Sequence, residues 1–283
     1  MKVAVIILNY NSSLDCIKCV SFLKRQTGVE LEIIIVDNCS RADDVEQLRR
    51  LCKEQGCTLI ENHENRGYNA GNNIGLRYAA EKGYKYALIA NPDMEFPQVD
   101  YVKKLAEIME KNPEVVVCGS DIVGNDGEHQ NPMRRDGGWR TAYVWLSAVL
   151  TQQHVYGLPN NYQESRYCDK VSGCCLMLRM DFIYQLGFFD ERIFLYCEEA
   201  ILSRQVERAG KRMFYTADVQ AVHRHVKGEK GNPVPRFKAW IKSRLYFERE
   251  YNYQGCVSHA LKVVGWRWYL LAYRLQFALR DKH

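Results

Sequence analysis

Four short apolar runs, separated by segments with apolar residues at helical spacing, make up the first third of the chain. The runs are rich in Val, Ile and Leu, which favours buried strands, and the segments between them favour amphipathic helices. Strands are predicted at 3–9, 31–37, 58–62 and 84–90, and helices at 14–26, 43–55 and 72–83. This alternation predicts an α/β fold with a mostly parallel central sheet, right-handed crossovers and flanking helices.

The alternation becomes looser after residue 112. We predict strands at 115–124, 167–179 and 211–223, helices at 140–153 and 198–210, and a polar loop at 125–140. From Pro235 onward the chain is basic and aromatic, with helical spacing. Because no repeat or low-complexity linker interrupts the sequence, we predict one domain at 1–230, with halves at 1–112 and 113–230, and a C-terminal helical extension at 231–283.

Polar residues follow each of the four N-terminal strands. The segments are NYN (9–11), DNCS (37–40), NHENRGYNAGNN (62–73) and NPD (91–93). The carboxyl ends of parallel strands meet at one edge of a sheet, where ligands bind, so these segments should line one crevice. The predicted ligand-binding residues are Asn9, Tyr10, Asn11, Asp37, Asn38, Ser40, Asn65, Gly67, Asn69, Asn91 and Asp93.

Several of these residues are typical of a nucleotide site. LNYNSS lacks the glycines that a dinucleotide-binding dehydrogenase needs after its first strand. Tyr10 can stack on a base and Asp37 can accept hydrogen bonds from a base or ribose, although a core aromatic and a helix cap are the simpler alternatives. Gly67 and Gly71 permit close approach of the backbone to a ligand, and the helix behind them suits a diphosphate; a capping loop is the alternative.

Asp93 follows Pro92 at the end of an apolar strand. Asn, Pro and Asp all favour turns, so a turn is the simpler interpretation. A carboxylate held on a rigid strand end also suits a hard divalent cation. The strand pattern alone leaves both interpretations open.

Composition restricts the remaining classes. The net charge of +5, from 39 basic and 34 acidic side chains, is too small to indicate nucleic-acid binding. The sequence has no recognisable signal peptide and no apolar stretch of about 18 residues. Eleven cysteines, an odd number inside predicted elements, indicate a reduced, cytoplasmic chain. Cys16 and Cys19 lack a second pair at zinc spacing and are interpreted as buried small hydrophobes.

Seven motifs occur in one order along the chain: ILNYN, IIVDNCS, NRGYNAGNNIGL, ALIANPD, SGCCLMLR, LGFFDERIFLYCEE and VHRHVKG. From residue 3 to about 228 the chain resembles a family 2 glycosyltransferase of the GT-A fold, an inverting enzyme that uses nucleotide sugars. It is most similar to rhamnosyltransferase-like members that build bacterial cell-wall and other surface polysaccharides. The resemblance implies that 1–112 binds a UDP- or dTDP-linked sugar and 113–230 a saccharide or lipid-linked acceptor.

The resemblance also answers the question that Asp93 raises. In this family NPD fills the place of the Asp-x-Asp metal motif, which implies that Asp93 binds Mg²⁺ or Mn²⁺ on the donor diphosphate. Asn91 replaces the first acid of that motif, which removes one anionic ligand. His223 and His225 follow the last predicted strand, where the family often has a histidine near the metal.

The acceptor side follows from two further motifs. Glu198 and Glu199 take the family's Glu-Asp position, where one carboxylate is the general base, and position favours Glu199. The family's next Asp is Ile201 in this chain. Asp190 and Gly173 match positions near the acceptor, with a turn cap as the alternative for Asp190.

The C-terminal helix and two rival functions complete the predictions. Trp266, Leu270, Tyr273 and Phe277 form one apolar stripe, which predicts contact with the catalytic domain, with a second subunit in a homodimer, or with the inner face of the cell membrane. A sugar nucleotidyltransferase is a rival enzyme, but it would need a glycine-rich basic loop after the first strand. A non-catalytic partner that binds a nucleotide sugar is the rival from another class.

Overall fold

The structure is a computed structural model that describes residues 1–136, 161–225 and 234–280, with side chains as far as Arg274 in the last helix. The helix predicted at 140–153 lies outside the described residues. All eleven cysteines are free thiols. Among the described helices, none is both long enough and apolar enough to cross a membrane.

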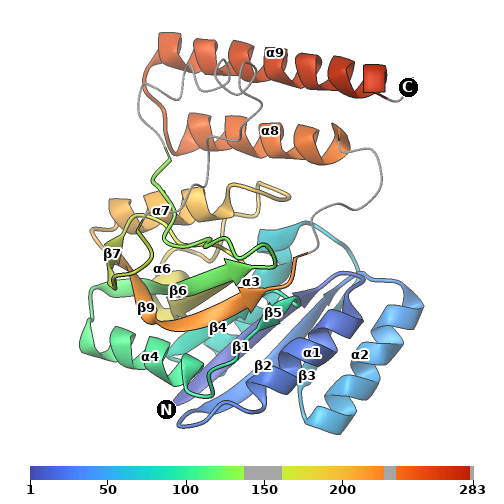
Figure 1. Cartoon of the computed structure of the whole chain (residues 1–283), viewed down its shortest axis with the longest axis vertical. Helices are drawn as coiled ribbons and strands as arrows, with labels where there is room; N and C mark the ends of the chain where they lie inside the picture. The colour runs from blue at the N-terminus through green and yellow to red at the C-terminus, as the bar shows by residue number, and fades with distance from the viewer. Residues whose placement is uncertain (137–160, 226–233, 281–283) are drawn as a thin grey trace.

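The N-terminal half forms the parallel part of a central sheet (Figure 1). β1 pairs in parallel with β2 and β4, and β2 pairs in parallel with β3. The predicted alternation is confirmed, with elements at β1 (Lys2–Asn9), α1 (Ser13–Leu23), β2 (Glu30–Asn38), α2 (Ala42–Gln55), β3 (Thr58–Asn62), α3 (Tyr68–Glu81) and β4 (Tyr86–Ala90). α3 begins four residues before its predicted start, because its first turns bury asparagines in place of apolar residues.

The C-terminal half adds strands of mixed direction. The sheet order is β3-β2-β1-β4-β8-β6-β9-β5, with β7 paired to β9. β8 is antiparallel to both β4 and β6, whereas β6 and β9 are parallel. The added strands are β5 (Met94–Glu95), β6 (Val115–Gly124), β7 (Arg166–Cys168), β8 (Cys175–Arg179) and β9 (Arg212–His223). The sheet is therefore mixed, with parallel pairing concentrated in its first half.

The strand predicted at 167–179 is wrong as a single element. Its first residues form β7 at the β9 edge, and its last residues form β8 in the middle of the sheet. The intervening turn contains Gly173, which carries the chain from one place to the other. The polar residues Asp169 and Lys170 and the flexible Gly173 between the two pieces are the sequence signal of this break.

Two apolar layers enclose the sheet. One layer packs α1, α2 and α4 (Tyr101–Lys111) against residues such as Val5 and Ile7 of β1. The other packs α3, α6 (Met180–Gln185) and α7 (Glu198–Arg208) against Ile6 and Leu8. Alternate β1 side chains thus face opposite layers, as the period of a strand requires.

Two C-terminal helices, α8 (Val234–Glu250) and α9 (Cys256–Arg280), lie at one end of the molecule, with α8 between α9 and the rest of the chain (Figure 1). Trp266 and Tyr269 of α9 are buried against Phe237 and Ile241 of α8, with Leu270 and Tyr273 packed beside them. The predicted stripe therefore covers α8 and is not available to a membrane. Phe277 lies outside the described side chains.

A buried set of charges, here called the C-terminal ion network, joins these helices to the half formed by residues 113–230. It consists of Asp136, Lys170, Arg244, Glu248 and Lys262. Arg244 contacts Asp136 at 2.8 Å and Glu248 at 2.7 Å. Lys262 contacts Glu248 at 2.8 Å, and Lys170 pairs with Asp136. Since α9, α8 and two loops contribute charges, the extension is anchored to the domain rather than appended to it.

Candidate active site

The ends of β1 and β2 are joined by a buried polar cluster, here called the strand-end network, formed by Asn9, Asp37, Ser40 and Asp44. The amide nitrogen of Asn9 lies 3.0 Å from Asp37 Oδ1, 2.7 Å from Asp44 Oδ2 and 3.0 Å from Ser40 Oγ. Asp37 Oδ2 accepts a bond from the Ser40 backbone N–H. Burial of polar groups is costly unless they are paired. Asn9 and Asp37, predicted to contact the ligand, thus use their polar atoms to shape the edge.

The turns that leave this network expose Tyr10. Its side chain is 53% exposed, where an aromatic ring can meet a ligand. Asn11 (φ 55°) and Cys39 (φ 66°) adopt the left-handed conformation, which is uncommon for residues other than glycine. Asn11 Oδ1 accepts a hydrogen bond from the Arg41 backbone N–H, which ties one turn to the other. Tyr10 therefore stands at the predicted crevice on a constrained turn.

The glycine and asparagine residues before α3 serve internal contacts. Asn38 Nδ2 donates to Asn65 Oδ1 at 3.0 Å, and Asn65 Oδ1 also accepts from the Gly67 N–H. A Cβ on Gly67 would lie 2.3 Å from the Phe194 carbonyl oxygen, which accepts the Tyr68 N–H at 2.8 Å. The N–H groups of Gly67 and Tyr68 thus face protein, and the diphosphate contact at this helix end stays a prediction.

Gly71 also makes a close approach to protein and not to a ligand. A Cβ there would lie 2.5 Å from the Leu8 side chain. The absence of a side chain lets α3 pack directly on β1. The close backbone approach that two glycines predict is present, but its partners are the chain's own segments.

The asparagines inside α3 hold the segment 187–195 against this helix. Asn69 Nδ2 donates to the Asp190 carbonyl at 2.8 Å. The Asn73 side chain donates to the Phe189 carbonyl and accepts from the Phe189 N–H, both at 2.9 Å. Asn69, predicted to bind the nucleotide sugar, therefore positions the segment that leads to the two glutamates.

Asp93, His223 and His225 lie together as predicted. One ligand atom from each falls within 4.8 Å of the others. Asp93 Oδ1 and His223 Nε2 face each other at 3.3 Å, yet both are buried without a hydrogen-bond partner. His225 Nδ1 lies 3.6 Å from Asp93 Oδ2. Two nitrogens and a carboxylate at this separation fit a divalent cation, because each can supply a lone pair to it.

A fourth residue, which sequence reasoning missed, sets the orientation of His223. Gln130 Oε1 lies 3.0 Å from His223 Nδ1 and can only accept, so Nδ1 carries the proton and Nε2 faces Asp93. Burial lowers the pKa of His223, but contacts with Asp93 and Cys174 outweigh it and raise the pKa to about 10, so a cation that binds Nε2 would have to displace a proton. Burial likewise opposes ionisation of Asp93, but His223 holds its pKa below the ordinary value.

Two strained residues place the glutamate pair at the start of α7. Tyr196 (φ 73°) and Cys197 (φ 68°) are consecutive left-handed residues, a conformation that costs about 1–2 kcal/mol per residue. The turn lets the Tyr196 N–H donate to Glu198 Oε1 at 3.0 Å. Glu199 Oε1 accepts from the Gly173 N–H at 3.2 Å. Strain of this kind is typical of positions that orient reacting groups.

The two glutamates differ in environment. Glu198 Oε2 is buried without a protein hydrogen-bond partner, whereas Glu199 accepts the Gly173 N–H. Both glutamates line a cavity of about 20 Å³, which has room for about one water molecule. Burial, reinforced by repulsion from Glu199, raises the pKa of Glu198 to about 8. Glu198 therefore holds a proton for much of the time at neutral pH.

Tyr68, also missed from the sequence, links the two groups of acids. Its hydroxyl lies 2.8 Å from Asn91 Oδ1 and 2.8 Å from the Gly173 carbonyl. The Asn91 N–H donates to the Cys174 carbonyl at 2.8 Å. The strand end that carries Asp93 is thus joined to the loop that holds Glu199. The signal was present in NRGYNAGNN, where Tyr68 is the one aromatic residue.

Asp190 is placed differently from its prediction. Its carboxylate accepts bonds from the Arg192 side chain and from the hydroxyls of Tyr246 and Tyr251 in and beside α8. Burial raises the pKa of Asp190, but these partners outweigh it and lower the pKa to about 2. Through these bonds Asp190 ties its segment to the C-terminal helices, and a role near the acceptor stays a prediction.

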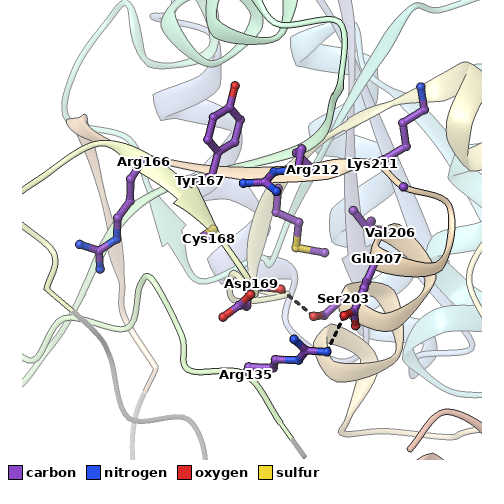
Figure 2. A pocket seen from close by; sticks show the side chains of 12 residues that line it. Arg135, Arg166, Tyr167, Cys168, Asp169, Ser203, Val206, Glu207, Lys211 and Arg212 are labelled. Carbon is purple, nitrogen blue, oxygen red and sulfur yellow. Dashed lines mark hydrogen bonds and ion pairs between the residues drawn. The ribbon is translucent and has the colours of Figure 1, made fainter.

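A pocket of about 600 Å³ opens away from this edge, between β7, β9 and α7 (Figure 2). Arg135, Arg166, Lys211 and Arg212 line it together with Asp169 and Glu207. None of the predicted site residues belongs to it, and Arg135 is already paired with Glu207. The predicted site residues therefore converge at the sheet edge and not in this pocket.

Solved structures share the fold. The chain superimposes on a structure of GalNAc-T7 with UDP, GalNAc and Mn²⁺, with a TM-score of 0.63, 16% identity, and coverage of 87% of this chain and 48% of that one. At this identity the likeness shows the fold, which is the GT-A arrangement of a mixed sheet flanked by helices.

Two curated relatives are similar in sequence. The chain is 27% identical to the low-salt glycan biosynthesis hexosyltransferase Agl10 of Haloferax volcanii, over 78% of this chain and 66% of that protein. It is 25% identical to the N-acetylglucosaminyl-diphospho-decaprenol L-rhamnosyltransferase of Mycobacterium tuberculosis, over 57% of this chain and 54% of that protein. The chain thus spans between half and two thirds of the length of these relatives. Residues 4–187 match the family model described as glycosyl transferase family 2, and by this match over most of its length the chain belongs to that family.

Proposed function

We propose that the protein transfers one sugar, with inversion, from a UDP- or dTDP-linked donor to a hydroxyl of a saccharide or lipid-linked acceptor during synthesis of a cell-surface glycan. The observation that carries this proposal is the convergence of two chemical groups at one edge. The cation-binding set of Asp93, His223 and His225 is joined through Tyr68 and Gly173 to the glutamate pair. The named activities of the two relatives support a glycan product.

The base of the reaction is Glu199. An inverting transfer needs one ionised carboxylate that takes the proton of the acceptor hydroxyl as its oxygen attacks the anomeric carbon and the nucleoside diphosphate leaves. Glu198 is a poor candidate because its free oxygen is enclosed and its raised pKa, about 8, keeps it protonated. The Gly173 N–H fixes one oxygen of Glu199 and orients the carboxylate.

Asp93, His223 and His225 would hold Mg²⁺ or Mn²⁺. When bound, the cation neutralises charge that develops on the leaving diphosphate. Gln130 fixes the His223 ring so that its Nε2 faces Asp93. Asn91 adds no charge to this set, and its side-chain oxygen accepts from Tyr68. Tyr10 provides the stacking face for the base, a contact worth about 1–3 kcal/mol.

A binding experiment tests the cation set. Calorimetric titration with UDP, dTDP and GDP, with and without Mn²⁺, should show Mn²⁺-dependent binding of one or more of these nucleotides by the wild-type chain. Asp93→Asn should lose the Mn²⁺-dependent part. Glu95→Gln, which removes a nearby carboxylate paired with Arg224, is the matched control and should retain it. Equal Mn²⁺ dependence in Asp93→Asn and wild type would contradict the assignment.

A turnover experiment tests the base and separates an enzyme from a non-catalytic binder. Glu199→Gln should lower donor hydrolysis or transfer by a factor of about 10²–10⁴ with donor affinity nearly unchanged. Glu198→Gln should have the smaller effect. A wild-type protein that binds the nucleotide sugar with Mn²⁺ but never releases the sugar would favour the non-catalytic partner instead.

A further inference from the structure

α9 has a second apolar face, opposite the one that packs on α8. Large apolar side chains on this outer face are exposed to solvent by 43% to 75%. They recur at alternating intervals of four and three residues, which places them on one side of the helix. This set, here called the outer stripe, consists of Val257, Leu261, Val264, Trp268 and Leu271. Scattered single apolar residues are normal on a surface, but a continuous row that includes an exposed Trp marks an interaction site.

The charge around the outer stripe has one sign. The stretch 251–280 contains no Asp or Glu. Arg267 and Arg274 are exposed and lie beside the stripe, since each follows one of its members by three residues. Over 234–280 the chain has nine Lys or Arg and two Asp or Glu, a net charge of +7, whereas the total of +5 leaves −2 for the other residues. Positive charge is therefore concentrated in the two C-terminal helices.

We propose that the outer stripe of α9 lies in the interface of an anionic lipid bilayer. The apolar side chains would enter the boundary between head groups and acyl chains, and Arg267 and Arg274 would contact anionic head groups. α9 is the outermost layer at its end of the molecule, with α8 behind it, so the stripe can meet a flat surface (Figure 1). The stripe spans about 21 Å at 1.5 Å per residue, which suits a helix lying parallel to that surface.

A second copy of the chain is the main competing occupant, and charge disfavours it. The four-and-three spacing of the stripe would also allow two helices to pair as a coiled coil. In a parallel pair Arg267 would lie across from Ala272 of the other copy, and in an antiparallel pair arginines would face arginines. With no acid in 251–280, neither arrangement offers these arginines a partner within α9. Anionic head groups offer these arginines a partner of opposite charge.

Vesicle co-sedimentation of the full-length chain tests the proposal. Vesicles of phosphatidylcholine mixed with phosphatidylglycerol should bind the wild type at low salt, and vesicles of phosphatidylcholine alone should bind it much less. The triple variant Leu261→Gln, Trp268→Gln and Leu271→Gln should lose at least about tenfold in partitioning. Arg267→Gln with Arg274→Gln should lose about fivefold for each arginine and most of the salt dependence.

A matched control replaces three large apolar residues that are at least half exposed and lie outside α9. Leu14→Gln, Val99→Gln and Tyr184→Gln should sediment as wild type does, because these residues lie off α9. Circular dichroism and the urea midpoint establish that each variant is folded. No nucleotide or acceptor is present, so the outcome does not depend on the proposed transfer reaction.

Two results would overturn the proposal. One is a wild-type protein that ignores anionic vesicles at low salt. The other is a folded stripe variant that binds them as tightly as wild type. If sedimentation velocity shows instead a dimer that the stripe variant converts to monomer, with no vesicle binding by either, the stripe belongs to an interface between copies.

Discussion

The strand-end network and the C-terminal ion network are both buried and polar, but they are built differently. The strand-end network uses short side chains from two adjacent turns, with Asn9 and Ser40 between two carboxylates. The C-terminal ion network uses long charged side chains that reach each other from α8, α9 and two loops. The first shapes a local edge beside the candidate site. The second holds together segments that are far apart in the sequence.

The difference teaches what each network contributes. Short side chains that pair locally, two neutral and two carboxylate, impose a precise turn geometry at modest energetic risk. Buried charges carry a large desolvation cost, so that they stabilise the fold only while every partner remains in place. We therefore expect the ion network to dominate stability and the strand-end network to dominate ligand geometry.

The largest effect is expected for Lys262→Met. Removal of this ammonium group leaves Glu248 buried with a lost partner, which should lower the free energy of unfolding by about 3–5 kcal/mol. Urea denaturation measures it. Arg49→Met, which breaks the exposed pair with Glu61, is the control and should cost about 1 kcal/mol or less. If the two variants lower the free energy of unfolding by similar amounts, the buried ion network does not dominate stability. In that case α9 could also be removed without unfolding the protein.

A smaller effect is expected for Asn9→Ala. Asp37 and Asp44 each lose a donor, which should cost about 1–3 kcal/mol of unfolding free energy and weaken nucleotide binding because the Tyr10 turn loosens. Asn125→Ala, on an exposed loop, should change stability little. If Asn9→Ala lowers stability but leaves nucleotide affinity intact, the strand-end network does not shape the ligand site.

The smallest effect on stability is expected for Glu198→Gln near pH 4.5. The difference between this variant and wild type should depend on pH. The folded-state pKa, about 8, lies above the ordinary value of 4.5, so the folded state binds this proton more tightly than the unfolded state. Wild-type stability should thus fall as pH rises from 4.5 to 8. The variant cannot ionise, so its stability relative to wild type should rise steadily across that range. A difference that is constant with pH would be inconsistent with a raised pKa.

Most of the first half of the fold was predictable from the sequence, because its central strands are short apolar runs and its helices each bury one apolar face. Prediction failed where long-range pairing decided the structure. The stretch 167–179 has apolar residues at both ends, yet these ends join different parts of the sheet. Helix α9 carries two apolar faces, and the sequence alone does not tell which one covers α8.

The candidate site shows the same limit. Asp93, His223 and His225 converge as predicted, since Asp93 directly precedes β5 and the two histidines lie at and just beyond the end of β9, its antiparallel neighbour. Asn69 and Gly67, predicted to bind the nucleotide sugar, also contact the segment 187–195, which is far away in the sequence and could not be seen as their partner. Polar residues near a strand end indicate a site without distinguishing the groups that touch the ligand from those that hold a neighbouring loop.

The attachment of 187–195 to α3 has a consequence for how this chain can change in length. Asn69, Asn73 and the Phe194 carbonyl fix this segment at three points along one helix. An inserted or deleted residue between these points and Glu198 would shift the carboxylates relative to Asp93 and leave backbone groups unpaired. Substitutions that preserve spacing can be absorbed there, but length variation among natural variants should be confined to other loops.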